Sequence, residues 1–373
     1  MLKKHLLGGA IVAALSLSAH AEFEYRVPMG MDFDVSSALE SAPQDLNSIS
    51  CADSHCYALK GGTIWSVGSN AYGELGREGT TSQYTWGNTG QPADSVVAGN
   101  NYGYALHNGT VWSVGSNTYG MAGRSGDLTV WGDTGQPATA IAAGDHHGYA
   151  LHNGTIWSVG RNTKGQLGRA GTTTQTTWGD TGQPASSIAA GYQHGYALHN
   201  GTIWSVGYNH AGQLGLSDLS DRQAWVNTGQ PATAITSGSN FGYALFSGTV
   251  WSVGFNGSGQ LGRGGTANQS SWGDTGQPAS SINGGSAHGY ALHNGTVWSI
   301  GRNVKGQLGR AGTTDQSSWG DTGQLADSIV AAGQYGYITN GSETLSVGHN
   351  SNGQLGFGDT ADRGNFTAVT ISE

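Results

Sequence analysis

The sequence predicts an all-β fold, a seven-bladed β-propeller of four-stranded antiparallel blades. Three observations support it: two evenly spaced series of tryptophans, short apolar runs of strand length, and recurrent Asn-Gly turns. The two series are Trp65, Trp112, Trp157, Trp204, Trp251 and Trp298, and Trp86, Trp131, Trp178, Trp225, Trp272 and Trp319. Their steps are 47 residues except for one step of 45 in each series, and Leu345 and Phe366 continue them. A fixed period of this size indicates seven stacked copies of one unit, none of which can bury its apolar face alone.

Each unit contains four segments with the composition of β-strands. In the unit that starts at Ser187 they surround Ile188, Tyr196, Trp204 and Trp225, and we name them strands A, B, C and D. The runs are short, rich in Ile, Val, Trp and Tyr, and lack a 3.6-residue period, which favours strands. Asn-Gly, the strongest short hairpin signal, joins B to C at Asn108, Asn153, Asn200 and Asn294. Such four-stranded units, repeated radially, form a propeller.

Small residues and tryptophans occupy different strands. Gly accounts for 65 of the 373 residues, and because the glycines recur at fixed places they indicate turns rather than disorder. Strand A carries Ala-Ala-Gly, which fits the crowded axis of a ring, whereas the tryptophans of strands C and D suit the wider outer gaps. Each tryptophan is expected to bury about 150–250 Å².

The N-terminal part of the chain differs from the repeat. Residues 1–21 are typical of a secretory signal peptide, with Lys3 and Lys4, an apolar stretch over 6–17, and a cleavage site at Ala19-His20-Ala21. Residues 22–46 form an N-terminal extension, and residues 47–373 form the seven-unit propeller. The apolar stretch is too short to span a membrane. We therefore expect an exported protein, periplasmic or extracellular, without membrane insertion.

The charge balance excludes some partners. Removal of residues 1–21 takes away two lysines and leaves 13 basic against 24 acidic residues. Nucleic acids and anionic membrane surfaces attract clustered Lys and Arg. The acidic balance therefore argues against both.

The two cysteines of the chain, Cys51 and Cys56, lie in the first unit. They flank a four-residue turn and would face each other across a hairpin. In an oxidising compartment this arrangement predicts a disulfide, and two buried thiols are the alternative.

The repeated motifs resemble a known family, the regulator of chromosome condensation repeats. They are Ile141-Ala142-Ala143-Gly144, His147-Gly148, Ala150-Leu151, Trp157-Ser158-Val159-Gly160, Asn162 and Gly165-Gln166-Leu167-Gly168. The resemblance covers residues 47–373 and implies seven blades; exported bacterial members include propellers that bind and inhibit β-lactamases. This chain departs from the pattern at Tyr102 and Phe241, which replace the motif histidine, and we expect the turn before Gly336 to be one residue short.

The loops are expected to divide between two faces. The B–C hairpins and D–A links repeat almost unchanged, so His107, His152, His199 and His293 are interpreted as turn residues. The A–B turns and C–D loops vary in aromatic and charged residues, which is typical of a recognition surface. The candidate partner-binding residues are Tyr72, Tyr119, Asp145, His146, Arg161, Lys164, Tyr192, Tyr208, His210, Phe255, Arg302 and Lys305. We predict a monomeric, non-enzymatic propeller that binds a protein through this face.

Three alternatives remain open from the sequence. The varied loops are also compatible with neutral drift on an exposed surface. Exposed Tyr and Phe on near-identical units also suit a glycan-binding module with multivalency. An enzyme is disfavoured because no catalytic constellation stands out. The histidines His55, His147, His194 and His288 could ring the axis, but no carboxylate accompanies them, so we expect neither a metal nor another cofactor.

Overall fold

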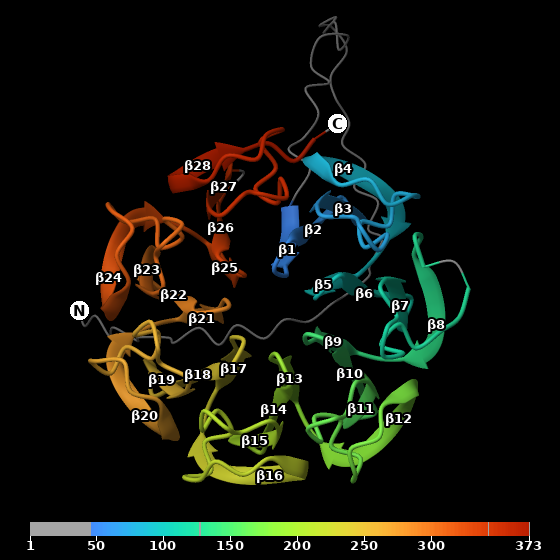
Figure 1. Ribbon diagram of the computed structural model, residues 1–373, viewed down its shortest axis with the longest axis horizontal. Coiled ribbons are helices and arrows are strands. Elements are labelled where there is room, and N and C mark those ends of the chain that lie inside the picture. Colours follow the sequence, from blue (N-terminus) through green and yellow to red (C-terminus); the bar gives the residue numbers. More distant parts are fainter. Residues whose placement is uncertain (1–45, 127, 342, 373) are drawn as a thin grey trace, which may run out of the picture. The chain divides into compact units, whose positions relative to one another are not determined.

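A computed structural model describes residues 46–126, 128–341 and 343–372. These residues form seven four-stranded antiparallel sheets arranged around one axis, as the sequence predicts (Figure 1). Each sheet is built from consecutive strands, so blade 1 is β1–β4 and blade 7 is β25–β28. The signal-peptide and N-terminal-extension predictions lie outside the described residues, apart from Leu46, where β1 begins. No helix in the described part of the chain is long and apolar enough to cross a membrane.

The strands take the order expected from one repeat, with A nearest the axis and D at the rim (Figure 1). The A strands are β1 (Leu46–Cys51), β5 (Ser95–Gly99), β9 (Ala140–Ala143), β13 (Ser187–Ala190), β17 (Ala234–Ser237), β21 (Ser281–Gly284) and β25 (Ser328–Ala332). The B strands are β2 (His55–Lys60), β6 (Tyr102–His107), β10 (His147–His152), β14 (His194–His199), β18 (Phe241–Phe246), β22 (His288–His293) and β26 (Tyr335–Asn340). The C strands are β3 (Thr63–Gly68), β7 (Thr110–Gly115), β11 (Thr155–Gly160), β15 (Thr202–Gly207), β19 (Thr249–Gly254), β23 (Thr296–Gly301) and β27 (Glu343–Gly348). The D strands are β4 (Gln83–Pro92), β8 (Gly132–Pro137), β12 (Gln175–Pro184), β16 (Arg222–Pro231), β20 (Gln269–Pro278), β24 (Gln316–Leu325) and β28 (Arg363–Val369).

The B–C hairpins have the tight turns that Asn-Gly predicts. In blade 4, His199 pairs with Thr202, and the turn residues Asn200 and Gly201 have φ values of 51° and 70°. Glycine adopts such angles without strain and asparagine tolerates them better than most residues. The turn therefore fixes the register of both strands.

Blade 2 departs from the other blades at its rim. Its C–D loop is two residues shorter, and β8 has six residues where five of the other D strands have ten. A groove lies beside the shortened loop and is lined by Trp131 and Val130 of blade 2 and by Arg77 and Asn88 of blade 1, among others.

Adjacent blades are joined by a buried tyrosine from each B strand. Tyr149 is fully buried, donates its hydroxyl to the Gln166 carbonyl, and packs its ring 5.5 Å from Trp225 of the next blade. Gly195 of blade 4 lies against the same ring, and a Cβ there would overlap the Tyr149 hydroxyl. Tyr57, Tyr104, Tyr196, Tyr243, Tyr290 and Tyr337 make the equivalent hydroxyl bonds in the other blades.

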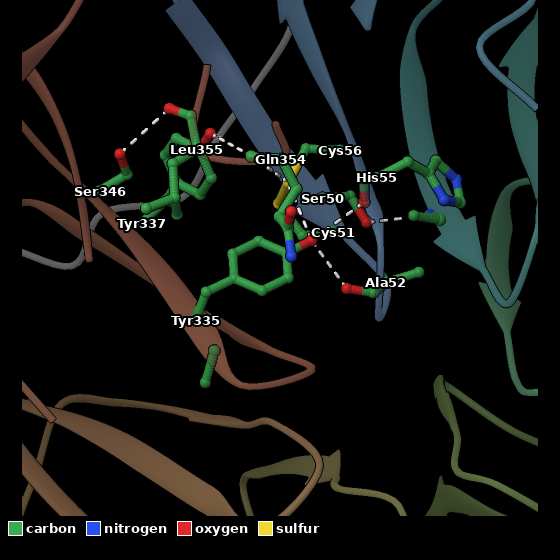
Figure 2. Close-up of a disulfide and its surroundings, with 12 residues drawn as sticks. Ser50, Cys51, Ala52, His55, Cys56, Tyr335, Tyr337, Ser346, Gln354 and Leu355 are labelled. Atoms are coloured by element: carbon green, nitrogen blue, oxygen red, sulfur yellow. Dashed lines mark hydrogen bonds between the residues drawn. A yellow bond between two sulfur atoms is a disulfide. The ribbon is translucent and has the colours of Figure 1, made fainter. Parts of the chain in front are cut away.

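The ring closes between blade 7 and blade 1 without exchanging a strand. Blade 7 ends with its own D strand, and its C–D loop pairs with β4 through Thr85 and Phe357. The Tyr335 hydroxyl donates to the Ala52 carbonyl at 2.7 Å and also contacts the His55 carbonyl at 3.1 Å (Figure 2). Beyond β28, Ile371 is buried in the seam. The seam is thus closed by hydrogen bonds and by buried apolar side chains.

The predicted disulfide is confirmed. Cys51 on β1 and Cys56 on β2 are directly paired in register, and their sulfur atoms are bonded (Figure 2). The bond therefore closes the A–B hairpin of blade 1 beside Tyr335.

Candidate functional site

The A–B turns and C–D loops lie at the same end of every blade. In blade 4 the Tyr208 amide, which opens the C–D loop, donates to the Gln193 carbonyl in the A–B turn at 2.9 Å. The other six blades make the same bond from Ser69, Ser116, Arg161, Phe255, Arg302 and His349. We call this surface the variable face. In each blade this bond joins the A–B turn to the C–D loop, so the two kinds of loop lie side by side on this face.

An asparagine, buried in every blade except blade 2, holds each C–D loop in shape. The Asn209 Oδ1 accepts the Leu214 amide at 2.8 Å, and its Nδ2 donates to the Asp218 carbonyl at 3.0 Å. Asn70, Asn117, Asn162, Asn256, Asn303 and Asn350 accept the equivalent amide in the other blades. These bonds fix the backbone that carries the varied side chains, so the face is preorganised.

Four of the candidate residues meet in a first cluster on blades 2 and 3. The Tyr119 ring lies 4.9 Å from the His146 ring and 5.1 Å from the Arg161 guanidinium. His146 approaches Asp145 at 3.4 Å. Burial and the Arg161 charge lower the pKa of His146, while burial raises that of Asp145. His146 is therefore neutral at pH 7, and its contact with Asp145 is a polar contact rather than a full ion pair.

Three further candidates form a second cluster between blades 3 and 4. The Lys164 ammonium lies 4.9 Å from the Tyr208 ring, which lies 4.6 Å from the His210 ring. Asp221 joins the cluster, 3.4 Å from Lys164 and 3.8 Å from His210. The cluster crosses the boundary between the blades.

A third cluster repeats this arrangement between blades 6 and 7. Lys305 binds Asp362 at 3.0 Å, and His349 contacts the same carboxylate at 3.0 Å. Asp221 and Asp362 are absent from the candidates predicted by the sequence, although both stand in an Asp-x-x-Asp-Arg segment found in blades 4 and 7. That repetition is the signal that identifies them.

The other candidates stand apart from these clusters. Tyr72, Tyr192 and Phe255 expose 53%, 43% and 38% of their surface. Arg302 is half-buried at the start of its loop. The exposed aromatic rings are free to pack against a partner, which is the usual role of such residues in interfaces.

A funnel opens at the centre of the variable face. Its cavity of about 120 Å³ is lined by the ends of the A strands and by the A–B turns of all seven blades. Asp53, Asn100, Asp145 and Tyr192 contribute the largest side chains, and the walls are mostly Gly, Ala and Ser. Asp145 therefore belongs both to the first cluster and to the lining of the funnel.

The motif histidines lie between the blades rather than around an open channel. His55, His147, His194 and His288 are fully buried, and each packs 5.0–5.3 Å from the tyrosine two residues later. Burial lowers the pKa to about 3 for His147 and His194 and to about 4 for His55 and His288. These side chains are neutral. Among the described residues, no group of three or more His, Cys, Asp or Glu could hold a metal ion.

The structure tests two expectations about the position of the motif histidine, which is the first residue of each B strand. Tyr102 and Phe241 occupy it in blades 2 and 5, as the sequence indicates, and both are fully buried. The expectation of a short turn before Gly336 is wrong. Ala332 pairs with Tyr335 in blade 7 just as Gly99 pairs with Tyr102 in blade 2, so Tyr335 takes the motif position and the turn has normal length.

The opposite face carries the repeated hairpin histidines. His152 lies 3.1 Å from the Asn153 amide group and 6.1 Å from the Trp157 ring, and His107 and His199 are placed alike. The His293 ring contacts Asn294 in the same way. The contacts stay within one hairpin, which agrees with their interpretation as turn residues.

Comparison with solved structures identifies the same architecture. Yeast RCC1 (Prp20) bound to Kap60 matches with a TM-score of 0.76 and 18% identity, over 91% of each chain. Prp20p from Saccharomyces cerevisiae matches at 0.71 and 19% identity, over 88% of each chain, and human WBSCR16 at 0.69 and 19%, over 78% of this chain and 85% of the other. No protein-family model and no curated protein sequence matches the chain. The fold of this chain is therefore the seven-bladed β-propeller of RCC1.

Proposed function

We propose that the chain is a non-enzymatic, exported propeller that binds a protein partner through the variable face. The observation that carries the proposal is the contrast between a fixed loop backbone, held by the buried asparagines, and side chains that differ from blade to blade. A preorganised surface with aromatic and charged side chains is suited to protein recognition. The disulfide of blade 1 supports an oxidising compartment outside the cytoplasm.

Two of the similar structures are protein-binding propellers. Yeast RCC1 was crystallised bound to Kap60, and the Prp20p structure was described with its binding properties to Gsp1p and histones. Their identity to this chain is below 20%, so they support a binding role in general and leave the partner open. Fold alone does not determine function.

The test is a pull-down from periplasmic extract and spent medium with the tagged protein. The comparison variant carries Tyr192→Ala, Tyr208→Ala and Phe255→Ala. A matched variant on the opposite face carries His152→Ala, His199→Ala and His293→Ala. We expect a protein that is retained by the unmutated chain and by the histidine variant but lost by the aromatic variant. Equal retention by the aromatic variant would refute the proposed face.

Glycan binding is a second candidate, supported by the exposed rings of Tyr72, Tyr192 and Phe255. Flat aromatic rings stack on the apolar faces of sugars, and repeated weak sites give avidity. A glycan array probed with the same three proteins decides between the candidates: a signal lost only by the aromatic variant would favour the glycan.

A further inference from the structure

Seven equivalent residues surround the mouth of the central funnel, one from each A–B turn. They are Asp53, Asn100, Asp145, Tyr192, Ser239, Ser286 and Gly333. Backbone bonds join several of the turns: the Tyr192 amide donates to the Ser239 carbonyl at 2.9 Å, and the Ser286 amide to the Gly333 carbonyl at 3.0 Å. These bonds fix the rim between blades 4 and 5 and between blades 6 and 7.

The described residues that line the funnel carry negative charge and no positive charge. They include Asp53 and Asp145, and none of them is Lys, Arg or His. Burial raises the pKa of Asp145, and the charge of Asp53 raises it further, while the Asn100 hydrogen bond, the His146 contact and the charge of Arg161 lower it. The two carboxylates therefore repel each other through the funnel. A cation placed between them would relieve that repulsion.

Hydrogen bonds hold both carboxylates in place. The Asn100 amide donates to Asp145 at 2.7 Å, and the Ser286 hydroxyl donates to Asp53 at 2.9 Å. The Ser286 bond spans from blade 6 to blade 1, and Gly333 of the intervening blade 7 has no side chain to obstruct it. Within the part of the chain that the structure describes, neither carboxylate forms a direct ion pair with Lys or Arg, although Asp145 contacts His146 at 3.4 Å and feels the charge of Arg161. The charge of the pair is thus held in place and only partly compensated.

The shape of the funnel favours a thin ligand with a charged end. Its volume of about 120 Å³ compares with roughly 10–15 Å³ for the space that one water needs. The small Ala and Gly walls fit an unbranched chain, and the exposed Tyr192 ring stands at the rim. Aromatic rings attract ammonium groups over their faces.

We propose that the funnel receives a lysine side chain of the partner protein, with its ammonium group between Asp53 and Asp145. The inference rests on the proposed function and adds the chemistry of the contact at the centre of the variable face. Charge complementarity selects a cation, and the narrow walls select the compact ammonium over the planar guanidinium of arginine.

A small probe tests the funnel without the partner. We would titrate the protein with Nα-acetyl-lysine methylamide, whose side-chain ammonium is free, and with Nα-acetyl-norleucine methylamide as the uncharged match. The backbone amide signals of Gly144, Gly191 and Gly333 would be followed by NMR. We expect saturable shifts with the lysine probe alone. They should vanish in the Asp53→Asn, Asp145→Asn variant but persist in an Asp274→Asn, Asp321→Asn variant, which has the same net charge. Equal shifts with both probes, or shifts that survive the funnel substitutions, would overturn the proposal.

The captured partner gives a separate readout. We expect the Asp53→Asn, Asp145→Asn variant to bind it about tenfold more weakly, with a smaller dependence on salt. If the variant binds the partner with unchanged affinity and the lysine probe causes no shifts, the lysine site in the funnel is refuted. The proposed function is unaffected by that result. If the unmutated chain retains no protein, the proposed function fails, while the probe titration still decides whether the funnel binds an ammonium group.

Discussion

Tyr335 of blade 7 donates its hydroxyl to the backbone carbonyl of Ala52 in blade 1 at 2.7 Å, and this bond crosses the only seam whose two sides are distant in sequence within the described ring. Tyr102 makes the same kind of bond between blades 2 and 3, to the His147 carbonyl at 2.6 Å and the Gly144 carbonyl at 3.2 Å. The two tyrosines therefore form a matched pair, one at the closing seam and one inside the ring.

We expect Tyr335→Phe and Tyr102→Phe each to lower the free energy of unfolding by about 1–3 kcal/mol, because buried carbonyls lose a donor. Only Tyr335→Phe should accelerate hydrogen exchange in both β1 and β25, since the seam lies between these two inner strands. Exchange measured by mass spectrometry on both variants checks this. Equal protection of β1 and β25 in the two variants would contradict it.

The buried histidines predict a loss of stability in acid. Their pKa is about 3–4 in the fold against 6.5 in the unfolded chain. Between these pKa values the histidines are protonated in the unfolded chain and neutral in the folded one. The free energy of unfolding is therefore greatest above pH 6.5 and falls as the pH drops toward 4. Each histidine should cost about 1.4 kcal/mol per pH unit across that window.

Replacement of two of these histidines should flatten the pH dependence. Phe241 occupies the same position in blade 5, so His147→Phe with His194→Phe is a substitution that the fold already accommodates. Urea unfolding between pH 4.5 and 7.5 should show about half the slope of the unmutated chain. An unaltered slope in the double variant would show that other groups govern the acid response.

The contact between Arg169 and Gly179 predicts that substitutions at these two positions have coupled effects on the free energy of unfolding. The Arg169 guanidinium lies over Gly179, where a Cβ would overlap it. Blade 4 has Leu216 and Val226 at these two positions, so the pair changes together within one chain. We expect Gly179→Val to destabilise the protein and Arg169→Leu to relieve the clash, with a coupling of about 1–3 kcal/mol in a double-mutant cycle. Simple additivity of the two changes would refute it.

The disulfide predicts a modest effect of reduction. Cys51 and Cys56 enclose a short turn, and closing a loop of this length stabilises a fold by about 2 kcal/mol in the chain-entropy account. We expect Cys51→Ala with Cys56→Gly, the residues found at Ala190 and Gly195, to lower Tm by a few degrees and to leave a cooperative transition. Calorimetry with and without reductant measures this; loss of the transition would show that the bond is required for folding.

The architecture could be predicted from the sequence because each repeat contains the local signals for its own strands and turns. Asn200-Gly201 specifies the hairpin, and Trp204 and Trp225 mark the strands that flank the C–D loop. Seven consistent copies make a local pattern decisive. The disulfide followed from the same local logic, since Cys51 and Cys56 lie across one turn.

The candidate site was only partly predictable, because its contacts cross from one blade to the next. Lys164 and Asp221 are 57 residues apart in the chain, and nothing local pairs them. The same is true of Asp53 and Ser286. Burial of Asp145 also depends on how neighbouring turns meet. Such relationships arise from the curvature of the ring, which a repeat pattern does not encode.

Ile371 follows β28 and is buried in the seam, where its carbonyl accepts a bond from Lys60. Every blade consists of consecutive residues, so its internal contacts have short sequence separation. The contacts that close the ring, in contrast, join residues 283 positions apart, as in the bond between Tyr335 and Ala52. Bringing such distant residues together costs chain entropy that the formation of a single blade does not require. Closure of the ring is therefore the long-range step in the folding of this protein.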